Sequence, residues 1–204
     1  GTGDPAFLHS EMKGVKAFNF LKNSGKKLFF AAGNCTQDFY GDGWAWNDYN
    51  DYYQAEINEL PLEDNVARLY ADTSDSLKIK PAYLQRYLKC DTAYRPKSFR
   101  VKRDFVDNTF AYPWMALPKN FKQEIPWKTS DSLTVALLED TLKEQVTEIN
   151  LPVPDSAKTI YDADADTVYK HMLQPSDNFI AEQLLLVCSS TKFKTLNSDS
   201  VINY

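Results

Sequence analysis

The sequence has no long apolar run, no closely spaced cysteine pair and no stretch of concentrated positive charge. Its apolar runs, such as Leu184 to Cys188, fall far short of the roughly 18 to 20 residues that a membrane-spanning helix requires. The net charge is −5, and lysines and arginines are interspersed with acidic residues, so nothing favours binding to a phosphate backbone. These absences argue against a membrane span and against nucleic acid as a partner.

Residues that bind metal ions are also sparse. Cys35, Cys90 and Cys188 are widely spaced, and neither His9 nor His171 has a cluster of possible ligands around it in the sequence. Structural metal sites usually show such residues at short, regular spacings. We therefore expect no metal and no other cofactor.

The chain does have enough apolar material for a folded core. Hydrophobic residues make up 43% and aromatic residues 14% of its 204 positions, which suits one large domain or two small ones. Apolar spacing predicts helices over 10–21, 130–148, 164–173 and from 178 onward, and a buried strand over 27–32. Helices and strands together predict an α+β fold.

The middle of the chain has β character. Residues 98–106 alternate so that Phe99, Val101, Arg103 and Phe105 would share one face of a strand. The prolines between positions 81 and 126 confine such strands to short or edge positions. This pattern is typical of a small insert domain.

We predict three parts along the chain. Residues 1–53 start an insert region that contains an aromatic loop, and residues 54–150 form a β-rich insert domain with a C-terminal helix. Residues 151–204 form a partial helical segment. The last boundary rests on Leu151–Asp155, where two prolines favour an extended linker.

The aromatic loop spans residues 35–53 and is rich in glycine, asparagine, aspartate and aromatic residues. Its rings, including Trp44 and Trp46, are best interpreted as an anchor packed within the fold, with a ligand cage as the alternative.

Ser176-Asp177-Asn178 is the sequence with most chemical meaning. By itself it suits a turn and a helix N-cap. Its surroundings add more, because residues 175–185 (PSDNFIAEQLL) closely resemble the S-D-N-x-x-A-E-x-L-L signature of the low-molecular-mass class C penicillin-binding proteins. Gly1–Leu8 resembles the G-x-G-D-P-x-L turn of that family, and Trp44–Tyr53 resembles its W-x-W-D-D…Y-Y segment.

The resemblance implies a serine-type D-alanyl-D-alanine carboxypeptidase/endopeptidase in the periplasm or cell envelope, with a penicillin-binding, transpeptidase-like domain. Its partners would be a peptidoglycan peptide and, in the full-length protein, β-lactams. Ser176 would relay a proton and Asn178 would bind the substrate amide, while Asp177 caps the helix. Trp46 and Asp48 are further candidates for substrate binding.

Two other motifs of that family are not expected here. Ser10–Lys13 and Ser24–Lys27 match S-x-x-K but follow the G-x-G-D-P turn, which is the wrong side of it, and Lys128-Thr129-Ser130 lacks the glycine of K-T-G. We therefore expect an internal fragment that is inactive alone and that could dimerise through a surface exposed by truncation.

The alternative function is a non-catalytic module that binds the cell wall or a partner protein through the aromatic loop. A further alternative is an insert that only orients a parent enzyme, without binding any ligand.

Overall fold

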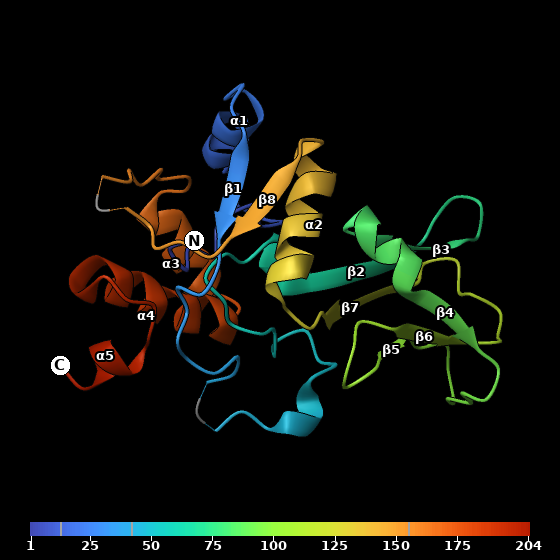
Figure 1. Cartoon of the computed structure of the whole chain (residues 1–204). Coiled ribbons are helices and arrows are strands. Elements are labelled where there is room, and N and C mark those ends of the chain that lie inside the picture. The colour runs from blue at the N-terminus through green and yellow to red at the C-terminus, as the bar shows by residue number, and fades with distance from the viewer. Residues whose placement is uncertain (13, 42, 155) are drawn as a thin grey trace. The chain divides into compact units, whose positions relative to one another are not determined.

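The computed structural model describes residues 1–12, 14–41, 43–154 and 156–204, and the chain divides into two compact units (Figure 1). The first unit comprises Gly1–Gly43, Glu56–Asp64 and Thr129–Tyr204, and the second comprises Trp44–Ala55 and Asn65–Lys128. The chain therefore leaves the first unit twice and returns to it at Glu56 and at Thr129.

The first unit is built around two parallel strands, β1 (Leu28–Ala31) and β8 (Val146–Ile149), with Leu28 paired to Val146. Parallel pairing needs a long connection between the strands, and here the connection holds the whole second unit. Helix α2 (Asp131–Leu142) lies beside β8 (Figure 1). Its leucines are buried.

The remaining helices of the first unit flank this pair in sequence. They are α1 (Lys16–Lys22), α3 (Ala165–Leu173), α4 (Asn178–Phe193) and α5 (Asp199–Ile202). Leu186 of α4 is fully buried and forms a core cluster with Ile57 and Leu196. Segments far apart in the sequence thus share one core.

The second unit is β-rich. Its strands are β2 (Val66–Ala71), β3 (Leu77–Lys80), β4 (Leu88–Asp91), β5 (Lys102–Arg103), β6 (Phe110–Pro113) and β7 (Lys122–Pro126). They form an antiparallel sheet in the order β3-β2-β7 and a mixed sheet in the order β4-β6-β5, with a short 3-10 helix at Ala82–Tyr87. Leu69, Ile79 and Ile125 are among the side chains that these strands bury.

The predicted α+β class is confirmed, but several element bounds differ. The helix expected over 130–148 ends at Leu142, because Lys143 is left-handed (φ 54°) and residues 146–149 pair with β1. The helix expected over 10–21 is α1, which begins only at Lys16.

The strand expected over 98–106 is paired only at β5. Val101 and Arg103 of its expected inner face are buried, whereas Phe105 is 51% exposed. The face is therefore buried at Val101 and Arg103, beside and within the segment that pairs with β6, and not at Phe105.

The two units also cross the predicted three-part division. Helix α2 falls in the first unit, where it packs on β8. The aromatic loop is divided between the two units, because the first unit ends at Gly43 and residues 44–55 belong to the second unit. The boundaries at 53/54 and 150/151 stay a prediction.

Candidate functional site

Ser176 and Asn178 lie at the junction of α3 and α4. Ser176 is exposed and has a left-handed backbone (φ 60°), and Asn178 is the exposed first residue of α4. Asp177 is the N-cap, because its Oδ1 accepts a hydrogen bond from the N–H of Ile180 (3.0 Å). Its own N–H donates to the carbonyl of Met172 (2.8 Å), which ties the turn to α3. The predicted capping role of Asp177 is confirmed.

A buried glutamine fixes this helix to the start of the chain. Gln183, on the second turn of α4, is fully buried. Its Nε2 donates to the carbonyl oxygens of Gly3 (2.7 Å) and Asn58 (2.9 Å), and its Oε1 accepts from the N–H of Asn58 (2.9 Å). The amide thus uses both of its ends in one rigid junction.

Gly3 allows that junction to close. Its φ is +77°, and a Cβ at this position would lie 2.7 Å from the Cβ of Leu186 on α4. Only glycine fits both the backbone conformation and the space. The Gly1–Pro5 turn and the helix that begins at Asn178 are therefore packed directly against each other, within the first unit.

Trp46 and Asp48 belong to the second unit, so the predicted site residues are divided between the two units. They form one turn of 3-10 helix, Trp46–Asp48. Trp46 is 70% exposed and meets Phe105 edge-on, with ring centroids 5.9 Å apart. Asp48 Oδ2 accepts a hydrogen bond from the Tyr53 hydroxyl (3.0 Å), and this bond raises the pKa of Tyr53.

A buried arginine, Arg103, is hydrogen-bonded to the aromatic loop. Arg103 is 1% exposed, and its guanidinium donates to the carbonyl oxygens of Pro126 (2.8 Å), Asp104 (2.8 Å) and Tyr49 (3.4 Å). It also lies over the Tyr49 ring, 5.0 Å from the centroid. The loop is thereby anchored through Tyr49, while Trp46 stays outside the core.

The serines of the two S-x-x-K strings, Ser10 and Ser24, each make a hydrogen bond. The Ser10 hydroxyl donates to Asp64 Oδ2 (3.2 Å), and Lys13, its expected partner, lies outside the described residues. Ser24 and Lys27 lie on either side of Gly25, beyond the end of α1, and Ser24 Oγ accepts from the N–H of Lys26 (3.2 Å). Ser24 and Lys27 therefore do not share a helical turn.

The Lys128-Thr129-Ser130 string is part of the framework. The Thr129 N–H (2.6 Å) and hydroxyl (2.7 Å) both donate to the buried carboxylate of Glu56. Ser130 is the N-cap of α2 and accepts from the N–H of Leu133 (3.2 Å).

The two histidines meet, although 162 positions separate them in sequence. Their ring centroids are 5.9 Å apart, His9 Nε2 lies 3.2 Å from Asp64 Oδ1, and His171 Nδ1 lies 3.3 Å from Glu11 Oε2. Among the described residues, no group of three or more His, Cys, Asp or Glu side chains has the arrangement of a metal site. Nor does any described helix have the length and apolar character of a membrane span.

The comparison of three-dimensional structures identified similar known proteins. No family model and no curated protein sequence matches the chain. The crystal structure of penicillin binding protein 4 (dacB) from Haemophilus influenzae is similar over 96% of this chain and 48% of its own, at 18% identity and a TM-score of 0.65. The chain has the fold of a penicillin-binding protein 4 region.

A second crystal structure of penicillin binding protein 4 (dacB) from Haemophilus influenzae, complexed with a novel β-lactam, gives a TM-score of 0.53 at 19% identity. It is matched over 96% of this chain and 46% of its own. The chain thus spans about half the length of the penicillin-binding protein 4 structures. The class C resemblance that the motifs predicted is confirmed at the level of the fold.

The sequence analysis did not identify Gln183 and Glu56. Gln183 holds the helix that begins at Asn178, and Glu56 holds Thr129 of the Lys128-Thr129-Ser130 string. The one available signal was polarity on an apolar helix face, since Gln183 lies between Ile180 and Leu186 at spacings of three. A polar side chain on such a face must find buried partners.

Proposed function

We propose that this chain is part of a serine-type D-alanyl-D-alanine carboxypeptidase/endopeptidase that acts on peptidoglycan in the periplasm. The junction of Gln183 with Gly3 supports the proposal most directly. It joins, in one packed unit, the two segments whose sequences resemble class C penicillin-binding proteins, Gly1–Leu8 and residues 175–185.

In the proposed reaction, a serine of an S-x-x-K motif attacks the carbonyl between the two D-alanines. The amine of the terminal D-alanine leaves with a proton, and water then hydrolyses the acyl-enzyme. Ser176 would relay the proton, since it is an exposed residue with a strained, left-handed backbone just before α4. Asn178 would bind the substrate amide from the first turn of α4.

The chain alone is proposed to be inactive. Ser24 and Lys27 do not share a helical turn, and the Ser10 hydroxyl donates to the carboxylate of Asp64. A nucleophile would come from elsewhere in a longer protein.

The test is labelling with a fluorescent penicillin, followed by denaturing electrophoresis and intact mass. We expect no adduct on this chain and one adduct on the longer protein that contains it. In that protein, Ser176→Ala should slow acylation about 10²- to 10⁴-fold, whereas Ser156→Ala, at another exposed serine, should leave it unchanged. An adduct on this chain, or a Ser176→Ala variant that labels at the normal rate, would refute the proposal.

A binding module is the second candidate, favoured by the exposure of Trp46 next to the half-exposed ring of Phe105. Large exposed aromatic side chains are typical of binding surfaces. Muropeptide binding that survives Ser176→Ala but is lost in Trp46→Ala would support this function over the first.

A further inference from the structure

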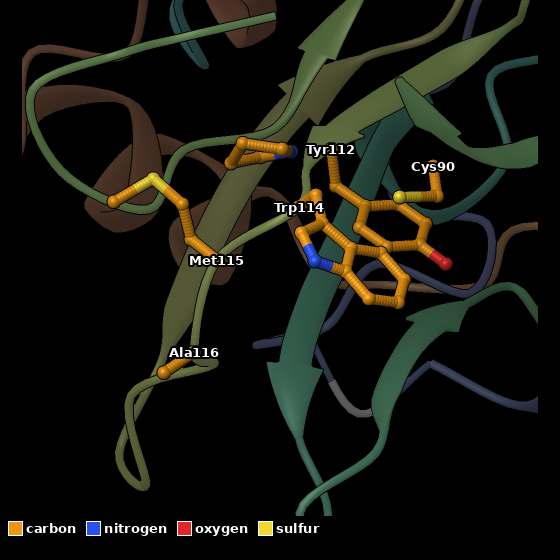
Figure 2. Close-up of a pocket in the computed structure, with 6 residues that line it drawn as sticks. Cys90, Tyr112, Trp114, Met115 and Ala116 are labelled. Atoms are coloured by element: carbon orange, nitrogen blue, oxygen red, sulfur yellow. The ribbon is translucent and has the colours of Figure 1, made fainter. Parts of the chain in front are cut away.

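A hollow of about 460 Å³ lies in the second unit, where the mixed sheet ends. It is lined by Cys90, Tyr112, Pro113, Trp114, Met115 and Ala116 (Figure 2). Its volume lies within the roughly 300–1,000 Å³ typical of small-molecule sites. None of the residues described as lining it carries a charge, so its walls favour a neutral ligand.

The sheet register brings the walls together. Cys90 of β4 is the partner of Tyr112 of β6, so their side chains lie on the same face of the sheet. Phe110, two residues earlier on that face, is fully buried. The face that forms the core at Phe110 therefore emerges into the hollow at Tyr112.

Trp114 and Met115 continue this surface beyond the strand. The N–H of Met115 donates to the carbonyl of Pro113 (2.9 Å), which closes a tight turn with Trp114 at its tip. Trp114 is 78% exposed and Met115 is 44% exposed. Figure 2 shows the rings of Trp114 and Tyr112 at the hollow, with Met115 and Ala116 further along the same loop.

The ring of Tyr112 packs against another aromatic side chain of the same unit. Its ring contacts Phe99, with centroids 6.5 Å apart, and Phe99 meets Phe121 edge-on at 4.9 Å. A braced ring loses little conformational freedom when a ligand binds. This arrangement favours recognition by a fixed ring face.

We infer that this hollow binds a neutral sugar ring of a glycan. The faces of aromatic rings carry partial negative charge, which attracts the weakly positive C–H groups on one face of a pyranose. The Trp114 indole N–H and the Tyr112 hydroxyl lie at the edges of the same rings, where they can bond sugar hydroxyls.

The uncharged lining disfavours an anionic peptide or a phosphate, whereas ring faces with polar edges suit a ligand that is apolar on its faces and polar at its rim. The inference goes beyond the proposed function and uses none of its residues. If both hold, the glycan strand of peptidoglycan supplies the sugar.

The experiment is saturation-transfer NMR on this chain with chitotetraose, a soluble neutral β-1,4-linked glycan, at up to about 10 mM because single sugar sites are weak. We expect transfer to the ring C–H protons and a loss of about tenfold or more in affinity in Trp114→Ala. Tyr161→Ala, which removes another ring that is 79% exposed and does not line the hollow, is the matched control and should bind normally.

Tyr112→Phe keeps the braced ring and removes only the hydroxyl, so it should bind more weakly than the unchanged chain but better than Trp114→Ala. Thermal unfolding of each variant verifies that it is folded. No transfer to the unchanged chain, or full transfer to Trp114→Ala, would overturn the inference. Penicillin labelling is a separate readout, so failure of either proposal leaves the other standing.

Discussion

Glu56 and Thr129 are bonded to each other at the two points where the chain re-enters the first unit. Each begins a returning segment, both are buried, and Glu56 Oε2 accepts from both the N–H and the hydroxyl of Thr129. Two residues 73 positions apart are thereby fixed at one place. The longer stretch of the second unit, Asn65–Lys128, lies between these two residues in the sequence.

Thr129→Val should destabilise the fold by roughly 1–3 kcal/mol, because the buried carboxylate of Glu56 loses the hydroxyl donor of Thr129 while the shape of the side chain is kept. Urea unfolding measures the change. Thr191→Val, at an exposed helical threonine, is the control and should stay within about 0.5 kcal/mol. Equal effects at the two positions would contradict the role assigned to the pair.

Gly3→Ala should destabilise by roughly 2–5 kcal/mol, from left-handed strain together with the clash against Leu186. Gly33→Ala separates the two effects, because Gly33 is also left-handed (φ +82°) but has open space around it. That variant should lose only about 1–2 kcal/mol. Thermal unfolding of the pair tests whether the junction with α4 is crowded as described.

Arg103→Lys should destabilise by roughly 2–4 kcal/mol, although the charge is kept, because an ammonium cannot reach three carbonyl groups with the geometry of a guanidinium. We expect Tyr49 to become mobile as well, visible as faster hydrogen exchange over residues 44–55. Arg95→Lys, at an exposed position, should change neither quantity.

Asp4 should make stability depend on pH. Burial raises the pKa of its carboxyl, and the nearby Asp162 carboxylate adds to this, against the hydrogen bond from the Ala6 N–H. Because the folded pKa is the higher one, this stabilisation is fully present below the unfolded pKa of about 3.9 and is lost as pH rises through the folded pKa.

Asp4→Asn keeps an acceptor for Ala6 but cannot titrate. Its stability should therefore fall less than that of the unchanged chain between about pH 3 and 7. Urea unfolding at a series of pH values measures both, with Asp38→Asn, at an exposed acid, as the control for the loss of one charge. Parallel pH curves for Asp4→Asn and the unchanged chain would rule out this role for Asp4.

Local patterns predicted the helices best where their ends are marked by caps. Residues 164–173 and the helix from Asn178 begin at aspartates whose side chains accept from the backbone, and both were found within a residue of the predicted start. The helix expected over 130–148 overran, because an apolar stripe does not reveal that Lys143 turns left-handed before a strand.

Long-range relations were beyond the reach of local pattern. The bonds of Gln183 to Gly3 and of Glu56 to Thr129 join residues 180 and 73 positions apart. No periodicity encodes such pairings, because they depend on how complete units pack. The motif predicted a helix start at Ser176–Asn178, which the structure has, but which residues fix that helix in place required the structure.

The pairing of β1 with β8 sets an order of events during synthesis. Val146 leaves the ribosome 118 residues after its partner Leu28, which at about 5–20 residues per second is a delay of roughly 6 to 24 s. The sheets of the second unit pair residues at most 60 positions apart, from Val66 with Pro126 down to Ala71 with Leu77, and all of their strands precede Val146 in the sequence. The strands of the second unit can therefore pair on the nascent chain before β1 pairs with β8.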